Sequence, residues 1–292
     1  MSIDKLRLHA VPVASVLVAL LIVWYAAAIG MNSAGAIERV LAPKGEWGAM
    51  DLIDSTWNMQ RPILPAPHQI AADLWASLVD FPLDSPRNLL YHAGVTAGAA
   101  LTGFAMGVLL GLLLAVCIVH SRTLDKALLP WIVASQTIPV LAIAPIVLVI
   151  LGTLGFSGVL PKATIAMYLC FFPVTVAMVQ GLRSPQKLEM ELIHTYSASR
   201  IQTFWMLRLP ASLPFLFPAL RVAIAGGLVG TIVAELPTGA QAGLGARLLT
   251  GSYYGNTVQI WSALFMASAL GIVLTSSVAL LEHLVVTRRR PA

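Results

Sequence analysis

Apolar residues occur in long blocks that are separated by short polar stretches. A helix that spans a bilayer requires about 20 mostly apolar residues, and several blocks reach or approach that length. These blocks are residues 11–31, 92–119, 128–152, 159–182, 212–235 and 259–281. The pattern predicts an all-α polytopic membrane protein with about six transmembrane helices. An even number of spans places both termini on the same side of the membrane.

The composition supports a bilayer as the solvent of this chain. Hydrophobic residues make up 58% of the sequence and charged residues only 11%, with a mean hydropathy of +0.83. Soluble domains carry about 25% charged residues. The formal net charge of +5 does not indicate nucleic acid, because the basic residues form no stripe with interleaved aromatic residues. We therefore expect membrane lipid, and no nucleic acid, around this chain.

The polar stretches divide the chain into five segments. We expect an N-terminal segment 1–10, a first span 11–31, an external segment 32–91, a core of transmembrane helices 92–285 and a basic tail 286–292. The first span is too long for the apolar region of a signal peptide and predicts a retained helix. In the external segment, apolar residues recur every three or four positions over 67–81, which predicts an amphipathic helix on the outer surface. Residues 32–62 show no clear periodicity and indicate no role.

The distribution of lysine and arginine sets the orientation. Cytoplasmic loops of membrane proteins are enriched in these residues. A cytoplasmic N-terminus places most of the 18 basic residues inside, whereas the external segment contains more acidic than basic residues. The inside residues are Lys5, Arg7, Arg122, Lys126, Arg183, Lys187, Arg200, Arg208, Arg288, Arg289 and Arg290. We therefore expect both termini in the cytoplasm.

Glycines recur at spacings of four and five in the second span. Small residues on one helix face let a second helix approach closely. The glycines are Gly94, Gly98, Gly103, Gly107 and Gly111. They predict that this face packs against another helix and not against lipid.

A few polar residues in or near the spans are candidates for function. Glu235 ends the fifth span, and an ionisable residue in apolar surroundings suggests a functional site. A carboxylate that reaches the membrane surface, or that caps the next turn, fits the sequence equally well. Gln136, in the third span, fits a translocation path or a hydrogen bond to a neighbouring helix. Arg221 indicates an interfacial or interhelical charge. Gly239, Gly243 and the glycines after them predict a bent outer or re-entrant loop.

The sequence offers no constellation for catalysis. The histidines and cysteines lack the spacing of metal ligands, and no histidine stands with a serine and a carboxylate in a nucleophile pattern. No G-x-x-x-x-G-K-[ST] loop is present to hold nucleotide phosphates. We expect no catalytic residue and no metal site in this chain.

The polar loop between the fourth and fifth spans, residues 183–213, is long for a connector. Leu188, Leu192 and Tyr196 lie on one helical side, Ser197 marks a break, and a second short apolar helix ends at Pro210. This pattern predicts a helix, a turn and a helix. From the residues alone, an amphipathic connector on the inner leaflet and a docking element for a partner remain equally open.

This loop resembles the EAA signature of binding-protein-dependent ABC importer permeases. The matching residues are Glu191-Leu192-Ile193, Ser197-Ala198-Ser199-Arg200, Phe204 and Leu209-Pro210. Two departures are that Leu192 and Ile193 replace the paired alanines and that Ser197 replaces the glycine. Other stretches resemble the nitrate, sulfonate and taurine group of these permeases, namely Ile63-Leu64-Pro65-Ala66-Pro67, Gln136-Thr137-Ile138-Pro139 and Ala234-Glu235 with Gly243-Leu244-Gly245.

The resemblance implies the type I ABC importer permease fold in a bacterial inner membrane. It implies a homodimer that docks ABC ATPase subunits and an external solute-binding protein, and that moves a small solute by alternating access. The solute would be nitrate, taurine, a sulfonate or a nitrogen heterocycle. ATP and Mg would be held by the ATPase, and this chain would bind no cofactor. The alternative is a secondary transporter driven by an ion gradient. Such a transporter is expected to have inverted repeats and ionisable residues at the membrane midplane, and neither is evident in the sequence.

The resemblance also assigns roles to residues of this chain. Coupling to the ATPase falls to Glu191, Ser197, Ala198, Ser199, Arg200, Phe204, Leu209 and Pro210. The candidates for the translocation path are Gln136, Pro139 and Glu235.

Overall fold

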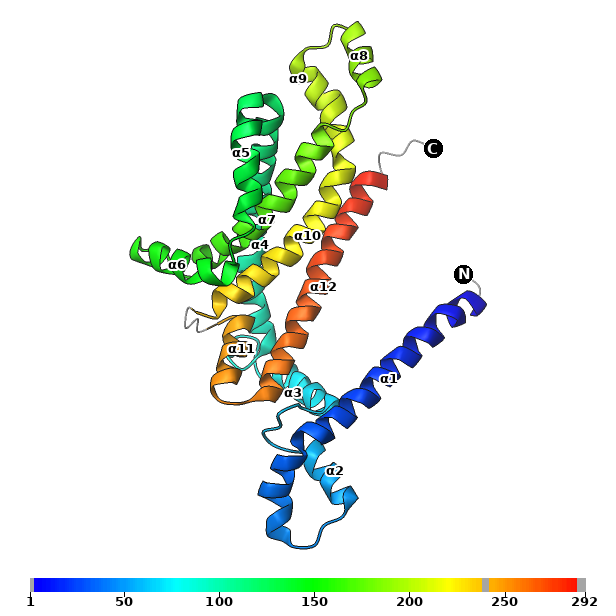
Figure 1. The fold of residues 1–292 in the computed structure, drawn as a ribbon, viewed down its shortest axis with the longest axis vertical. Coiled ribbons are helices and arrows are strands. Elements are labelled where there is room, and N and C mark those ends of the chain that lie inside the picture. The colour runs from blue at the N-terminus through cyan, green and yellow to red at the C-terminus, as the bar shows by residue number, and fades with distance from the viewer. Residues whose placement is uncertain (1–2, 238–241, 288–292) are drawn as a thin grey trace. The chain divides into compact units, whose positions relative to one another are not determined.

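The computed structural model describes residues 3–237 and 242–287, and helices dominate this part of the chain (Figure 1). No strand occurs within the described residues. Five helices include stretches long and apolar enough to cross a membrane. They are α1 (Ile3–Ala36), α4 (Leu89–His120), α7 (Val159–Leu182), α10 (Leu209–Glu235) and α12 (Thr257–Thr287). The all-α polytopic fold and five of the six expected spans are confirmed.

The expected span 128–152 is not one straight helix. Two helices, α5 (Arg122–Ser135) and α6 (Val140–Thr153), cover this region and meet at an angle of 103°. The break follows from Pro139, which lacks an N–H donor and disfavours a helical conformation at the preceding Ile138. The pair is therefore a broken span or a re-entrant segment.

The region after the first expected span is largely helical. The 34 residues of α1 extend about 51 Å at 1.5 Å per residue, which exceeds the hydrocarbon thickness of about 30 Å. A π-helical turn (Ile37–Leu41) and a 3-10 turn (Ala42–Lys44) continue α1, and α2 (Ala49–Trp57) packs against it. Residues 32–62 thus contain helices that the sequence pattern did not reveal.

A buried asparagine of α1 forms hydrogen bonds with the segment that follows α2. Asn32 is only 1% exposed, and its Oδ1 accepts the N–H groups of Ile63 and Leu64 at 2.7 and 3.2 Å. Its Nδ2 donates to Leu64 O at 2.8 Å. The next helix, α3 (Pro67–Val79), lies within the range 67–81 in which a helix was expected, and it begins with proline at its first position. The segment beyond α1 is thereby an ordered part of the fold.

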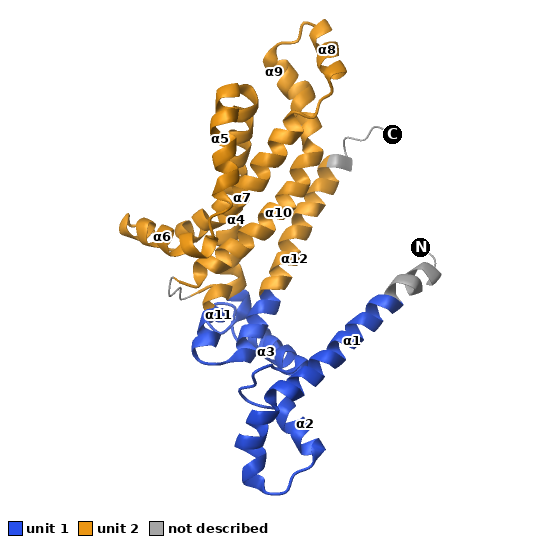
Figure 2. Ribbon diagram, viewed as in Figure 1, with its two compact units in different colours: residues 1–91, 247–266 blue, residues 92–246, 267–292 orange. Residues whose placement is uncertain are grey.

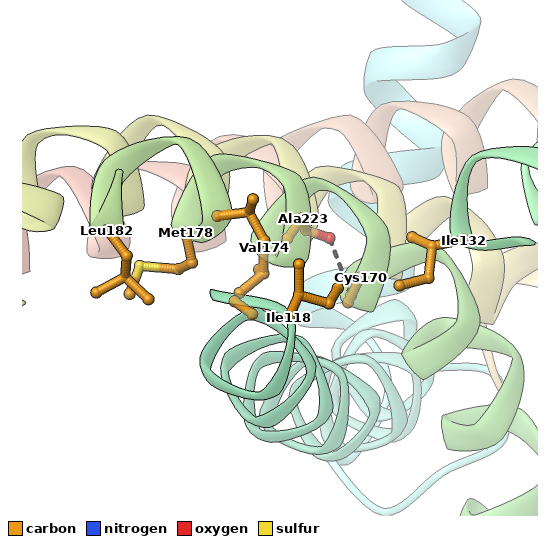
Figure 3. Packing of buried hydrophobic residues seen from close by; sticks show 9 residues of the cluster. Ile118, Ile132, Cys170, Val174, Met178, Leu182 and Ala223 are labelled. Atoms are coloured by element: carbon orange, nitrogen blue, oxygen red, sulfur yellow. Dashed lines mark hydrogen bonds between the residues drawn. The ribbon is translucent and has the colours of Figure 1, made fainter. Parts of the chain in front are cut away.

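The chain forms two compact units (Figure 2). Residues 1–91 and 247–266 make the first unit, and residues 92–246 and 267–292 make the second. The main core of the second unit lies between α4, α5, α7 and α10 (Figure 3). Its buried residues are Ala115, Ile118, Ile132, Cys170, Val174, Met178, Val179, Leu182 and Ala223.

Only part of the glycine series in α4 contacts another helix. A Cβ added to Gly111 would lie 2.8 Å from Phe171 O of α7, and Gly103 and Gly107 also face α7 closely. Gly94 and Gly98 have nothing within 4 Å. The five-residue step from 98 to 103 turns the helix by about 140°, so the two groups lie on different faces. The expectation of one continuous glycine face was wrong for Gly94 and Gly98.

Candidate functional site

The loop between α7 and α10 folds as a helix, a turn and a helix. The first helix, α8 (Lys187–Thr195), is followed by Ser197 with φ of +54°, and α9 (Arg200–Thr203) continues into a π-helical turn (Phe204–Arg208). Figure 2 shows α8 and α9 at one end of the second unit. Ser197 holds the left-handed conformation that glycine adopts most readily, so serine at this position still forms the predicted break.

Local contacts fix the shape of this loop. The Ser199 side chain accepts the N–H of Gln202 at 3.3 Å, and Gln202 Oε1 accepts the N–H of Ser199 at 2.8 Å, which forms a capping box at the start of α9. Phe204 packs against the main core, and its ring centroid lies 5.5 Å from that of His120 at the end of α4. The loop is therefore braced against the helix bundle.

Large apolar side chains of the loop are exposed. Leu188, Leu192, Tyr196, Ile201, Trp205 and Met206 are between 59% and 78% exposed. Leu188 and Leu192 lie one helical turn apart in α8, and exposed apolar side chains that neighbour one another in this way mark interaction sites. Among the other residues assigned to coupling, Glu191, Arg200 and Pro210 are exposed, whereas Ala198 and Leu209 are half-buried. Glu191 pairs with Lys187 at 3.7 Å, but this surface pair contributes at most about 1 kcal/mol.

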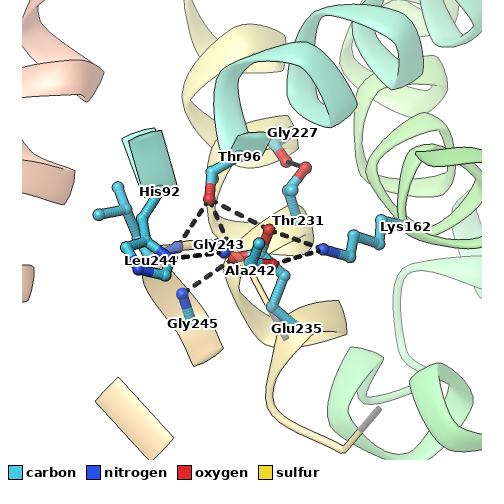
Figure 4. Close-up of polar contacts among 10 residues, drawn as sticks. All are labelled: His92, Thr96, Lys162, Gly227, Thr231, Glu235, Ala242, Gly243, Leu244 and Gly245. Carbon is cyan, nitrogen blue, oxygen red and sulfur yellow. Dashed lines mark hydrogen bonds and ion pairs between the residues drawn. The ribbon is translucent and has the colours of Figure 1, made fainter. Parts of the chain in front are cut away.

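A polar cluster lies at the ends of α7 and α10 that are remote from the α8–α9 loop. Figure 4 shows its side chains. Lys162, in the first turn of α7, places Nζ 3.2 Å from Oε1 of Glu235, the last residue of α10. Glu235 is 0% exposed and Lys162 is 7% exposed. Thr96 of α4 donates to the same carboxylate at 3.0 Å. This ion pair is buried among protein groups and does not reach a surface, unlike the alternative in which Glu235 extends to the membrane interface.

Side chains of the same cluster accept hydrogen bonds from three consecutive backbone N–H groups at the start of α11 (Leu244–Tyr253). Gly243 donates to His92 Nδ1 at 3.0 Å, Leu244 to Thr96 Oγ1 at 2.9 Å and Gly245 to Glu235 Oε2 at 2.9 Å. The first N–H groups of a helix have no partner within the helix, so side chains here take that place. The loop predicted from its glycines thus ends in a helix, while Gly239 lies outside the described residues.

Sequence reasoning missed Lys162 and Thr96. Ionisable residues within an apolar span are rare, and Lys162 and Glu235 stand at corresponding ends of two antiparallel spans. These two facts are readable in the sequence and would have indicated the pair. The structure does not join Gln136 or Pro139 to this cluster by any hydrogen bond among the described residues; Gln136 is exposed at the end of α5 and Pro139 is exposed before α6.

Residues 107–291 match a protein family described as the binding-protein-dependent transport system inner membrane component. The match covers more than half of the chain. The chain belongs to this family. As such it is a multi-pass inner-membrane permease subunit of an ABC transport system, with the ATPase on a separate subunit and a solute-binding protein as a further component. The permease is a transport subunit and not an enzyme.

Relatives cover most of the permease. The formylaminopyrimidine transport permease protein of Halalkalibacterium halodurans is 32% identical over 78% of this chain and 86% of the relative. A probable ABC transporter permease protein of Haemophilus influenzae is 31% identical over 84% of this chain and 96% of the relative. The riboflavin transport system permease protein of Chloroflexus aurantiacus is 32% identical over 77% of this chain and 80% of the relative. The recognition of an ABC importer permease from the sequence is confirmed.

Proposed function

We propose that the α8–α9 loop is the element on which the ATPase docks. The observation that carries this proposal is the cluster of exposed apolar side chains on a capped and braced helical loop. Short amphipathic helices commonly bind by placing their apolar side in a groove of the partner. The turn at Ser197 and the capping box at Ser199 give the loop a defined shape, which a docking element requires.

The individual residues divide into two roles under this proposal. Ser197 and Ala198 form the tight turn that lets the ATPase approach, and Glu191 and Arg200 flank it with opposite charges. Ser199 caps α9. The residues that transmit force to the bundle are those that pack against its core, namely Phe204 and Leu209, and Pro210 follows them in the first turn of α10.

We further propose that the permease works as a homodimer with both termini in the cytoplasm. The orientation follows from the basic residues of the loop 183–213, which contains α8 and α9 and is called the docking loop below. Arg183 and Arg208 are among these residues. Exposed apolar side chains on α4 and α10, such as Leu109 and Val229, provide surface for lipid and a second copy. ATP-driven closure of the ATPase would then rock the helices and open a central path by alternating access. ATP and Mg belong to the ATPase, and the permease binds no cofactor.

The translocation path passes the break between α5 and α6 in this proposal. Gln136 and Pro139 are exposed there, where an unwound backbone presents polar groups. Glu235 does not line the path in this proposal. It holds α4, α7 and the start of α11 together at the outer end of the path. Two relatives are named as transport permeases for formylaminopyrimidine and for riboflavin. These names favour a nitrogen heterocycle as the solute over nitrate, taurine or a sulfonate.

The docking proposal is tested by copurification. The tagged chain is extracted in mild detergent, and the amount of ATPase that copurifies is quantified by mass spectrometry for wild type, Leu192→Asp and Leu83→Asp. Leu83 is an equally apolar and exposed residue of the external segment, at 68% against 59% for Leu192. Burying an unpaired charge in an interface costs several kcal/mol, so Leu192→Asp should lower bound ATPase by at least about tenfold.

Leu83→Asp should leave the ATPase bound at the wild-type ratio. Unchanged ATPase on Leu192→Asp would overturn the docking role of α8–α9. An equal loss from both variants would show a general effect of the added charge and would also count against the proposal.

A further inference from the structure

The buried Lys162–Glu235 ion pair is not explained by stability. Breaking such a pair is costly, but replacing both charges by packed apolar residues is often neutral or stabilising. Ionisable residues within membrane helices are usually retained for a functional reason. Both side chains are almost completely buried and stand at the ends of α7 and α10 that lie farthest from the docking loop.

The pair holds the connection between α10 and α11 as well as the two helices. Lys162 Nζ donates to Ala242 O at 3.1 Å, and Glu235 Oε2 accepts the N–H of Gly245 at 2.9 Å. The backbone at Gly243 and Gly245 touches the Glu235 side chain so closely that a Cβ at either position would overlap it. Segment 242–245 therefore moves with α7 and α10 unless these contacts break.

The helices α7 and α10 are packed tightly along their length. A Cβ at Gly181, near the docking loop, would lie 2.8 Å from Ser212 Cα, and one at Gly230 would lie 2.8 Å from Leu169 Cδ1. Close-packed interiors have low compressibility and transmit displacement. The 20 helical steps from Lys162 to Leu182 correspond to about 30 Å. A displacement delivered at one end of this helix pair is therefore carried to the other.

We propose that Lys162 and Glu235 are positioning residues that tie segment 242–245 to the α7–α10 pair, so that movement of the docking loop is transmitted to the α10–α11 connection. Thr96 serves the same link, because its hydroxyl donates to Glu235 and accepts the N–H of Leu244. This inference rests on the proposed function, since it takes the docking loop as the point where the ATPase acts.

The test measures how nucleotide changes the exposure of segment 242–245. A single reporter, Ala242→Cys, is placed in a Cys117→Ala background, because Cys117 is exposed whereas Cys170 is buried. The purified complex with its copurified ATPase is labelled with a hydrophilic maleimide, without nucleotide and with ATP plus orthovanadate. Coupling between sites usually amounts to at least about fivefold, and we expect a change of that order in the labelling rate of the parent.

Three variants distinguish a positioning role of this cluster from a role in stability alone. Lys162→Met/Glu235→Gln removes both charges and leaves none unpaired, Thr96→Val removes the hydroxyl, and Thr96→Ser keeps it as the matched control. We expect the nucleotide response to fall to near unity in the first two and to persist in Thr96→Ser, with bound ATPase unchanged in all three. A structural role alone would alter yield or thermal stability but not this ratio.

A parent-like response in both the double variant and Thr96→Val would overturn the inference, as would a parent complex that binds ATPase but shows no response. Failure of the proposed function has a different signature, because then no ATPase copurifies with the parent or Leu192→Asp fails to release it.

Discussion

The contact between α4 and α7 at Gly111 allows a quantitative prediction. A Cβ at this position would lie 2.8 Å from Phe171 O and 2.9 Å from Val174 Cβ. Carbon atoms in contact lie about 3.5–4.0 Å apart, so Gly111→Ala requires the two helices to separate by roughly 0.5–1 Å. Overpacking of this kind costs about 1–3 kcal/mol, and the backbone carbonyl of Phe171 cannot rotate away as a flexible side chain would.

Gly98→Ala is the matched control for this prediction. It lies in the same helix, and nothing stands within 4 Å of the added methyl group. Both changes gain the same helix propensity, up to about 1 kcal/mol, so their difference isolates the overlap. Thermal unfolding in detergent should give a midpoint for Gly111→Ala on the order of 2–10 °C below that of Gly98→Ala. Equal midpoints would refute the close packing of α4 on α7.

Two further predictions concern the docking loop and the external segment. Ser197→Gly should relieve the left-handed backbone at the turn and stabilise the loop by up to about 1 kcal/mol, seen as slower hydrogen exchange in residues 196–200; faster exchange would contradict the assigned turn. Asn32→Leu should remove the acceptor of the part-buried N–H groups of Ile63 and Leu64 at about 0.5–1.5 kcal/mol for each hydrogen bond, and limited proteolysis should then cut near them. Leu83→Asp is the control there, and unchanged resistance of Asn32→Leu would contradict the fastening role of this amide.

The spans and the docking loop could be predicted because each depends on a local pattern. Runs of apolar residues define a membrane helix, and the turn at Ser197 follows from the residues around it. The break at Pro139 was also encoded locally, but the long apolar stretches on both sides of it made the region resemble one span. Hydropathy measures length and polarity and does not register the missing N–H of one proline.

The Lys162–Glu235 cluster could be predicted only in part because its members are far apart in the sequence. Glu235 was singled out by its position at the end of a span, but its partners come from α4, α7 and the start of α11. Which side chains meet depends on the rotation of each helix about its axis, and that is set by packing of the glycines in α4 against α7. The order of residues 32–62 was not predicted for a different reason. It depends on contacts between residues far apart in the sequence, among them the Asn32 amide with Ile63 and Leu64 and the indole N–H of Trp57 with the carbonyl of Tyr25.

The central claim is that the α8–α9 loop couples this permease to an ATPase, and site-specific photocrosslinking tests it most directly. A benzophenone amino acid replaces Tyr196 in the loop or, as the control, Tyr253 at the end of α11, which are 78% and 80% exposed. Irradiation of intact membranes, followed by mass spectrometry of the crosslinked partner, should join position 196 to a protein with a Walker-type nucleotide site, whereas position 253 should not crosslink to it. The absence of such a partner at position 196, or its crosslinking at position 253 instead, would contradict the account.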